Sequence, residues 1–339
     1  MSSIDIVVPC YRYGRYLRGC VLSALNQGVE HIRVLILDDA SPDETPEVAT
    51  ALAREDSRVT YRRHAVNQGH ISTFNEGIDW TSADYMLLLS ADDYLLPGAL
   101  QRAIDHMDAH PDVGMCFGQA LAMHGDGTLH QIELEAVSSG EPSAVVSGAE
   151  FVRMCARAGT NNIVPTPSAV IRTNLLKRLG GYRPDLPHAG DMEMWLRVAA
   201  HAPIGILYTN QAVYRRHGAN MSSAYLQDHS LSDLQQRKVA IDAFRDICRT
   251  SAPEMLRVYQ SLLPPMALDA VGHASSAFNA NRMELCQRLC DFATSAHPGV
   301  RRSPAWLALA CKKLMGHRMS TALLPTVTRI REARTWIHG

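Results

Sequence analysis

The stretch DYMLLLSADDYLLPG, residues 84–98, is an apolar run that ends in two adjacent acids. Its apolar residues 86–89 predict a buried strand. Ser90 and Ala91 follow, then Asp92 and Asp93, then apolar residues and a Pro-Gly turn. Two carboxylates this close repel each other, and neither is buried cheaply without a partner. We therefore treat the end of this strand as a candidate binding site.

Strand and helix patterns alternate through the first half of the chain. Short apolar runs predict strands at 4–9, 32–39, 58–63, 85–90 and 113–125. Helix-type spacing and helix start signals predict helices at 12–28, 41–55, 71–81 and 97–110. This alternation is typical of an α/β fold in which helices cover both faces of a parallel sheet.

The pattern is less regular further along the chain. Helices are predicted at 147–159, 174–182 and 191–201, with a hairpin turn at 124–130 and a strand at 165–172. Beyond residue 223 the pattern is helical almost to the end. We therefore expect an α/β domain at residues 1–225 and a helical region at 226–339 that contacts an acceptor, another copy of the chain or a membrane.

Charge and targeting signals limit the classes of function. The 339 residues carry a formal net charge of −1, so general attraction to nucleic acid is not expected. The N-terminal residues lack the pattern of a secretory signal, and no apolar run reaches the roughly 18 residues of a transmembrane helix. We therefore expect a cytoplasmic protein.

The C-terminal tail is basic. From Arg301 onward the chain has eight Lys or Arg against one acid, Glu332, so this part carries +7 and the rest −8. Two explanations stay open, contact with the inner face of an anionic cell membrane and a solvated helix face. Residues 304–318, which join apolar and basic residues, fit either membrane contact or packing against the preceding helices.

Carboxylates are expected to gather at one edge of the sheet. Asp38 and Asp39 end the second strand as Asp92 and Asp93 end the fourth, and Tyr11 follows the first. Ligands of open parallel α/β sheets bind beyond the C-terminal ends of the strands. Acidic oxygens there favour Mg²⁺ or Mn²⁺, whose remaining positions are filled by water and ligand phosphates.

A nucleoside diphosphate held by such a cation accounts for both acid pairs. One pair meets the cation, and the other accepts hydrogen bonds from ribose hydroxyls or a base N–H. The chain has no G-x-x-x-x-G-K-[ST] loop, so the metal and side chains must meet the phosphate charge. The alternative for either pair alone is a helix N-cap or a turn, where Asp is favoured.

Six segments, in this order, resemble glycosyltransferase family 2, a group of inverting enzymes with the GT-A fold. They are VVPCYRYGRYLRGCVLSALNQ (7–27), LILDDASPDET (35–45), NQGHISTFNEGI (67–78), LLLSADDYLLPGAL (87–100), GDMEMWLRVA (190–199) and YRRHGANMS (214–222). The resemblance implies a Rossmann-like, mostly parallel sheet flanked by helices, followed here by an α-helical C-terminal region. It also implies sugar transfer from a nucleotide diphosphate sugar.

The resemblance assigns five residues to the donor nucleotide. Pro9 and Tyr11 frame the base, Asp39 accepts from the base N–H, and Asp92 meets the ribose, with Asn67 beside them. A UDP-sugar is the expected donor, with dTDP- and GDP-sugars as alternatives. The expected acceptor is a hydroxyl of a growing glycan or of a lipid-linked glycan, as in polysaccharide synthesis.

The resemblance also implies a metal site and a general base. Asp93 and His217 would hold Mn²⁺ or Mg²⁺, and Asp191 would take the proton of the acceptor hydroxyl. A positioned base contributes about 10²–10⁴ in rate, and a metal stabilises the charge that develops on the leaving diphosphate. The alternative for Asp191 is an N-cap of the helix at 191–201.

Two positions depart from the family pattern. Ser90 stands where many members have the first Asp of DADD, and Gly190 where many have the Glu of an ED pair. Both substitutions make the site poorer in acid. The choice between Asp92 and Asp93 as the metal ligand therefore stays open.

Four residues have two interpretations each. Arg215 and Arg216 could form an anion site for the diphosphate or have no such role, and the adjacent His217 could be a plain loop histidine. Trp195 could stack near the acceptor sugar, or pack in the core with Met194 and Val198 of its own helix.

Three functions compete at this point. The main interpretation is a metal-dependent inverting glycosyltransferase of the hexosyltransferase type. A sugar nucleotidyltransferase would share the α/β crevice and the metal, but it normally has a Gly-rich basic loop where this chain has CYRYGRY, residues 10–16. The third interpretation is a non-catalytic nucleotide-sugar-binding assembly protein, which would have no need of Asp191. Homo-oligomer formation stays open.

Overall fold

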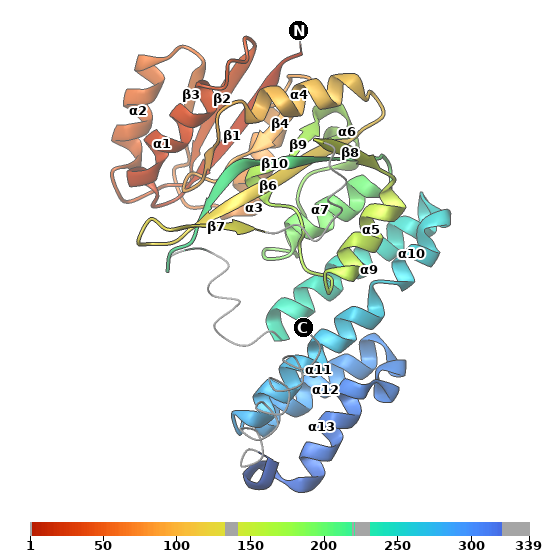
Figure 1. The fold of residues 1–339 in the computed structure, drawn as a ribbon. Helices are drawn as coiled ribbons and strands as arrows, with labels where there is room; N and C mark the ends of the chain where they lie inside the picture. Colours follow the sequence, from red (N-terminus) through yellow and green to blue (C-terminus); the bar gives the residue numbers. More distant parts are fainter. Residues whose placement is uncertain (1, 133–141, 219, 221–230, 321–339) are drawn as a thin grey trace.

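The computed structural model describes residues 2–132, 142–218, 220 and 231–320 (Figure 1). The strands are β1 (Ile4–Cys10), β2 (Ile32–Asp38), β3 (Val59–Arg63), β4 (Tyr85–Leu88), β5 (Tyr94–Leu95), β6 (Met115–Met123), β7 (Leu129–Ile132), β8 (Ser143–Val146), β9 (Val170–Arg172) and β10 (Ile204–Arg215). The helices of the first part are α1 (Gly14–Leu25), α2 (Thr45–Glu55), α3 (His70–Trp80), α4 (Ala99–Ala109), α5 (Gly148–Arg157), α6 (Thr173–Leu179) and α7 (Gly190–Ala199). Those of the second part are α9 (Leu231–Thr250), α10 (Leu256–Gln260), α11 (Leu263–Asn279), α12 (Met283–Ala296) and α13 (Pro304–Met315). Short 3₁₀ turns are η1 (Thr166–Ser168), η2 (Pro253–Met255) and η3 (Pro298–Arg302).

The sheet has a parallel half and a mixed half. Its strand order is β3-β2-β1-β4-β9-β6-β10-β5. The strands β3, β2, β1 and β4 are parallel neighbours, so that Val7 lies beside Leu35 on one side and Leu88 on the other. β6 and β10 are parallel to each other, whereas β9 runs antiparallel between β4 and β6. The α/β architecture is confirmed, and β5, β7 and β8 add antiparallel edges to it.

The main difference from the sequence prediction lies in the later strands. Only Val170–Arg172 of the predicted strand at 165–172 is a strand, because residues 166–168 form η1. β10 was not predicted, since Thr209 and Asn210 interrupt its apolar run where its pairing with β6 shifts register. The predicted hairpin is present between β6 and β7. The predicted domain boundary near residue 225 lies outside the described residues.

Alternating side chains bury both faces of the sheet. Ile6 of β1 belongs to the apolar cluster that includes Leu17 of α1, and the next residue, Val7, belongs to the cluster on the opposite face. That second cluster continues through Trp195 of α7 to Phe244 of α9. The helical region therefore shares a core with the sheet, and Figure 1 shows α9 between that layer and α11–α13. Within the described part of the chain, no helix has the length and apolar character needed to cross a membrane.

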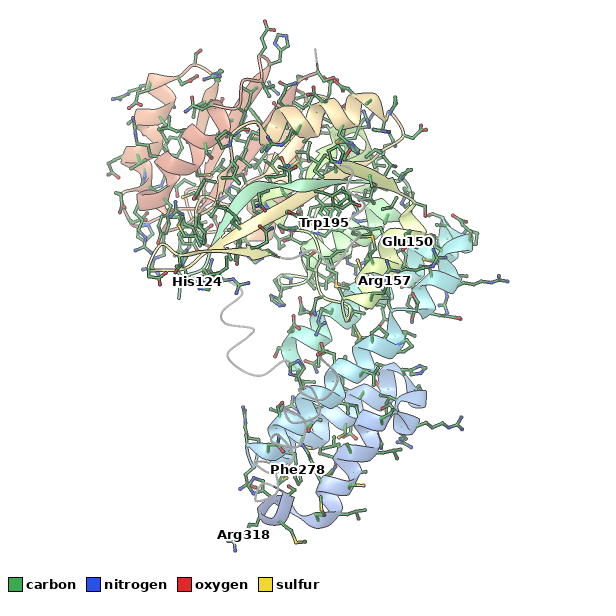
Figure 2. The ribbon with its side chains drawn as sticks, in the orientation of Figure 1. His124, Glu150, Arg157, Trp195, Phe278 and Arg318 are labelled. Carbon is green, nitrogen blue, oxygen red and sulfur yellow. The ribbon has the colours of Figure 1, made fainter. Side chains whose placement is uncertain are left out.

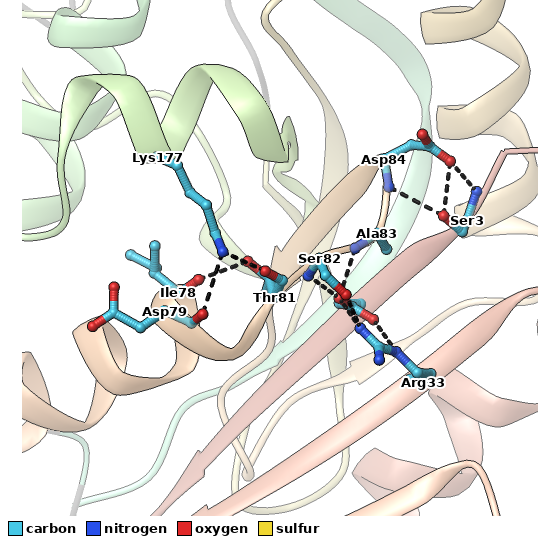
Figure 3. A network of polar contacts seen from close by, with 10 residues as sticks. Ser3, Arg33, Ile78, Asp79, Thr81, Ser82, Ala83, Asp84 and Lys177 are labelled. Atoms are coloured by element: carbon cyan, nitrogen blue, oxygen red, sulfur yellow. Dashed lines mark hydrogen bonds and ion pairs between the residues drawn. The ribbon is translucent and has the colours of Figure 1, made fainter.

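A polar network ties together the N-terminal ends of the parallel strands (Figure 3). The buried Asp5 carboxylate of β1 accepts from Nε and Nη2 of Arg33 of β2 at 2.8 and 2.7 Å. It also accepts from the backbone amides of Ser82 and Ala83, just before β4, at 2.7 and 2.9 Å. One carboxylate thus links three adjacent strands and accepts from four N–H donors.

Replacing Asp5 by Ala should therefore lower the free energy of unfolding by about 2–3 kcal/mol, because it leaves two amides and a guanidinium without their acceptor. Urea denaturation measures this change. The matched control is Glu55→Ala, which breaks the surface pair between Arg18 and Glu55, whose side chains are 51% and 49% exposed. That loss should stay below about 1 kcal/mol. Equal losses in the two variants would contradict the role given to Asp5.

Candidate functional site

The predicted acids lie at the C-terminal edge of the parallel strands, but they are not equivalent. Asp38, at the end of β2, accepts from the Ser41 amide at 2.8 Å and from the Tyr61 hydroxyl at 3.0 Å. Arg63 Nε lies 3.4 Å from the same carboxylate. Asp38 is fully buried, and through these contacts it holds the turn after β2.

Asp39 organises the loop that leads into α3. Its Oδ1 accepts from His64 Nδ1 and from the Gln68 amide, both at 2.7 Å, and its Oδ2 accepts from the Gly69 amide at 2.9 Å. Asn67 donates to the backbone oxygen of Asp39 at 3.2 Å. Gly69 has a φ of 83°, a conformation that favours glycine. Of about four acceptor positions on a carboxylate, one on Oδ2 is left for a ligand.

Asp92 pairs with a histidine from the far end of β10. His217 Nε2 donates to Asp92 Oδ2 at 3.1 Å, and Asn220 Nδ2 donates to the same oxygen at 3.3 Å. The His217 ring stacks on Tyr16 with a centroid distance of 5.4 Å and meets the edge of Tyr13 at 5.5 Å. These two rings, both from the turn after β1 and the start of α1, fix the orientation of the imidazole.

Asp93 has a different environment from its neighbour. It is 2% exposed, and its Oδ1 accepts from the Arg215 backbone amide at 2.9 Å. Burial, with the adjacent Asp92 carboxylate second, raises its pKa well above the usual value. Burial also raises the pKa of Asp92, although His217 and Arg215 partly offset it. Of the two carboxylates, Asp92 is the one that accepts the hydrogen bond from His217.

Two adjacent basic residues lie at the end of β10: Arg215 is its last residue and Arg216 follows it. The Arg215 guanidinium lies 5.0 Å from the ring centre of Tyr16 and 5.1 Å from that of Tyr94. Its Nε is buried and has no hydrogen-bond partner within the described residues. Arg216 is exposed. The Arg215 amide and the His217 ring, at and just after the end of β10, both contact the acid pair.

The acid pair fits a divalent cation that brings its own ligands. Within the described ranges, no three His, Cys, Asp or Glu side chains are placed to hold a metal by themselves. A cation at Asp92 would therefore take most of its ligands from water and a bound phosphate, as Mg²⁺ commonly does. Two buried carboxylates with raised pKa values are also a place where added positive charge is favoured.

Asp191 lies in the first turn of α7. Helix α7 begins at Gly190 with Ala189 at its N-cap and has no side-chain cap, so the N-cap alternative for Asp191 is wrong. Its Oδ2 accepts from the Thr166 hydroxyl at 2.7 Å, and the Tyr182 hydroxyl is a second donor. Burial raises the pKa of Asp191, and these two hydrogen bonds offset part of the shift.

The loop before Asp191 is anchored to the helical region. His188 Nε2 donates to Asp233 of α9 at 2.8 Å, and the His188 amide donates to Gln236 at 3.2 Å. Arg237, 5% exposed, pairs with Asp233 at 2.9 Å and with Asp269 of α11 at 2.6 Å. Two helices of the second part therefore fix the segment that carries Asp191.

The remaining predicted residues differ in exposure. Tyr11 is 42% exposed, with the Arg12 guanidinium 5.9 Å from its ring centre, and Pro9 is partly buried. Trp195 is 2% exposed within the main core, as its core interpretation predicts, and Figure 2 shows it beneath the sheet. The acceptor-stacking interpretation of Trp195 is wrong because its ring is covered.

Sequence reasoning missed four residues of this edge: Tyr13, Tyr16, Thr166 and Asn220. The two tyrosines lie three residues apart at a predicted helix start, in the segment YRYGRYL, which is a readable signal for a shared face. No local pattern indicates Thr166, which reaches Asp191 from 25 positions away; Asn220 belongs to the family segment at 214–222, but its partner Asp92 lies 128 positions away.

Comparison with known sequences gives a family for this chain. The family model described as Glycosyl transferase family 2 matches residues 5–180. An uncharacterised glycosyltransferase of Haemophilus influenzae is 31% identical over 107 residues, which are 32% of this chain and 43% of that protein. An uncharacterised glycosyltransferase of Nostoc is 27% identical over 229 residues, 65% of this chain and 67% of that protein. The match thus spans less than half the length of the first relative and about two thirds of the second.

Solved structures share the fold. TarS of Staphylococcus aureus, residues 1–349 with UDP-GlcNAc, superposes with a TM-score of 0.58 at 15% identity, covering 88% of this chain and 92% of that one. A mannosyltransferase of Pyrobaculum calidifontis, solved with GDP-Man and Mn²⁺, gives a TM-score of 0.52 at 15% identity, with 89% and 87% covered. This likeness confirms the expected GT-A fold with a helical C-terminal region.

Because the acid pair is buried, we predict an unusual pH dependence for the free energy of unfolding of the metal-free protein. The folded pKa of Asp93 lies above its unfolded value, so its stabilising contribution is present at low pH and is lost as pH rises through the folded pKa. Asp93→Asn cannot ionise and keeps an acceptor for Arg215. In EDTA, the stability of this variant relative to the native protein should rise from pH 5 to pH 8, as measured by urea denaturation.

Asp43→Asn is the matched control for that measurement. Although burial acts the other way, hydrogen bonds from Thr45 and Gly14 hold the pKa of Asp43 below its usual value. Its carboxylate therefore stabilises the fold above its unfolded pKa, and the variant should be less stable than the native protein at both pH values. Loss of stability in Asp93→Asn at pH 8 would contradict the like-charge account of the acid pair.

Proposed function

The chain belongs to glycosyl transferase family 2, and from that premise we propose that it is a metal-dependent inverting glycosyltransferase using a nucleotide diphosphate sugar. The observation that carries the proposal is the buried pair of Asp92 and Asp93. Asp92 accepts a hydrogen bond from the His217 ring, and Asp93 accepts one from the Arg215 backbone amide. A pair of carboxylates in this position needs positive charge, and a cation bound to a diphosphate supplies it.

Donor binding is proposed for the edge formed by β1 and β2. The remaining acceptor position on Asp39 Oδ2 suits a base N–H, because the three protein donors already fix the orientation of that carboxylate. Tyr11 is exposed enough to contact a base, and Pro9 precedes it on the same edge. Asn67 holds the backbone of Asp39 and so positions this acceptor. UDP-sugars are the first candidates, and GDP-sugars are the alternative, as in the two solved neighbours.

The contacts of the acid pair suggest a division of labour between Asp92 and Asp93. Asp92 and His217 are the protein groups best placed to meet Mn²⁺ or Mg²⁺, since they already share one hydrogen bond. Asp93 is turned to the Arg215 amide, where it holds the end of β10 in place. When bound, the metal would stabilise charge on the leaving diphosphate. Arg215 and Arg216 lie beside it and can add positive charge at the phosphates.

Asp191 is proposed as the base that takes the proton of the acceptor hydroxyl. Burial raises its pKa, which makes its carboxylate a stronger base than an exposed one. Thr166 and Tyr182 hold it in one orientation, and the contact of His188 with Asp233 fixes the preceding loop. Attack from the side opposite the leaving diphosphate would invert the anomeric carbon. The proposed acceptor is a hydroxyl of a glycan, free or linked to a lipid carrier.

A panel of nucleotide sugars with Mn²⁺ and candidate glycan acceptors tests the proposal. Release of nucleoside diphosphate that depends on the acceptor and stops in EDTA is the expected result. Release of pyrophosphate would instead indicate a sugar nucleotidyltransferase. Metal-dependent nucleotide binding with no turnover on any acceptor would indicate a non-catalytic binding protein.

Asp191→Asn should lower kcat by at least about 10²-fold while the Kd of the donor, measured by calorimetry, changes less than about twofold. Because the base must be ionised, the rate of the native enzyme should fall as pH drops through the raised pKa of Asp191, above the range of an exposed carboxylate. The control is Asp185→Asn, in the same loop, whose carboxylate pairs with Arg183 at the surface. Full activity of Asp191→Asn would refute the assignment.

His217→Ala should raise the Mn²⁺ concentration for half-maximal activity by about 10–100-fold, because it removes one proposed metal contact and releases Asp92. Activity titrations at fixed donor and acceptor concentration measure this shift. His201→Ala, an exposed histidine at the other end of α7, is the control and should leave the titration unchanged. Identical curves for native protein and His217→Ala would place the metal elsewhere.

A further inference from the structure

Helix α13 exposes an apolar stripe to solvent. Its side chains Leu307, Leu314 and Met315 are 55%, 88% and 40% exposed. The remaining members of the stripe, also exposed and at helical spacing, are Pro304, Ala308 and Cys311. On the opposite side, Leu309 is 2% exposed and packs with Trp306 in the main core. The helix is thus apolar on the face that it buries and on the face that it presents; we call the exposed face the α13 stripe.

Basic residues flank the α13 stripe along the chain. Residues 301–320 contain no Asp or Glu, and their five cations are Arg301, Arg302, Lys312, Lys313 and Arg318. Both lysines also bond to the neighbouring helices: Lys312 donates to Ser275 and Asn279 of α11 at 2.8 and 3.3 Å, and Lys313 donates to Gln287 of α12 at 3.1 Å. Figure 1 shows α13 at the end of the helical region far from the sheet, and Figure 2 shows Arg318 at the outermost tip.

We propose that the α13 stripe and its flanking cations form a docking surface for an anionic lipid bilayer. A helix that is apolar on all sides is normally covered, and large exposed apolar patches mark contact sites. An interfacial helix inserts its apolar face at the level of the headgroups while its Lys and Arg pair with anionic lipids. The α13 region has both features, an exposed apolar face and nearby Lys and Arg side chains.

Charge favours a bilayer over a second copy of the chain. A two-fold contact through the α13 stripe would bring the same five cations of each copy toward one another, with no acid in residues 301–320 to pair them. An anionic bilayer offers the complementary charge and an apolar layer at the same surface. Met319, shortly after α13, is a further exposed apolar residue, 58% exposed.

The consequence for transfer rests on the proposed function. If the acceptor is linked to a lipid carrier, docking through α13 brings the enzyme to the surface where that acceptor lies. Bilayer binding itself needs neither donor nor acceptor, so it can be measured separately from catalysis.

Vesicle flotation with the full chain tests the proposal. The probes are vesicles of phosphatidylcholine alone and vesicles that also contain phosphatidylglycerol. The native protein should float with the anionic vesicles and bind the neutral ones at least about tenfold more weakly, and added salt should weaken the anionic binding. Failure to bind anionic vesicles would overturn the proposal.

Substitutions test which side chains make the contact with the bilayer. The double variant Leu307→Glu/Leu314→Glu and the charge variant Arg302→Glu/Lys313→Glu should each bind anionic vesicles at least about tenfold more weakly. The control is Val66→Glu, a surface apolar residue, 68% exposed, outside the helical region. It should bind like the native protein, and all variants should keep the native thermal transition and turnover on a soluble acceptor.

Other outcomes of the same experiment would assign the α13 stripe to another occupant. A dimer that the Leu307→Glu/Leu314→Glu variant dissociates, with unchanged vesicle binding, would make the stripe an interface between copies. A lower thermal transition with unchanged vesicle binding would indicate that residues 321–339 cover it. Lost vesicle binding with intact turnover supports the proposal, whereas lack of turnover in the native protein would count against the proposed function alone.

Discussion

Asp92 and Asp93 lie buried side by side at the end of β4, and the repulsion between them is the constraint on which the rest of the site depends. The two carboxylates are stabilised by different hydrogen-bond donors. Asp93 takes the Arg215 backbone amide, and Asp92 takes His217 and Asn220. Neither carboxylate has a side-chain guanidinium bonded to it, so the charge of the pair is only partly compensated within the described residues. A cation that arrives with a diphosphate completes the compensation.

The opposite end of the same sheet shows how the chain behaves where no ligand is needed. Asp5 is equally buried, but it takes a bidentate arginine and two backbone amides and needs nothing more. The contrast between Asp5 and the pair at β4 separates acids that stabilise the fold from acids kept for binding. Asp38 belongs with the first kind, whereas Asp39 combines both, since three protein donors leave it one acceptor position.

The sequence predicts the parallel half of this fold well because its strands are uninterrupted apolar runs that alternate with helices. It predicts the acids at the sheet edge for the same reason, since one pair ends such a run and the other comes two residues after one. It misses β10, whose run breaks at a register shift, and therefore also the pairing of His217 with Asp92 across 125 positions. Resemblance to a family supplied His217 as a candidate, but only the fold gives its partner. The anchoring of the Asp191 loop by Asp233 is likewise invisible in the sequence, because it joins the two parts of the chain.

The most direct test of this account is the affinity of the protein for UDP and GDP in Mn²⁺ and in EDTA, measured by calorimetry without any sugar acceptor. If the acid pair is completed by a cation carried with the diphosphate, the better nucleotide should bind at least about tenfold more tightly with Mn²⁺ than with EDTA. Equal affinity in the two conditions would contradict the account, because the phosphates would then bind beside two uncompensated carboxylates.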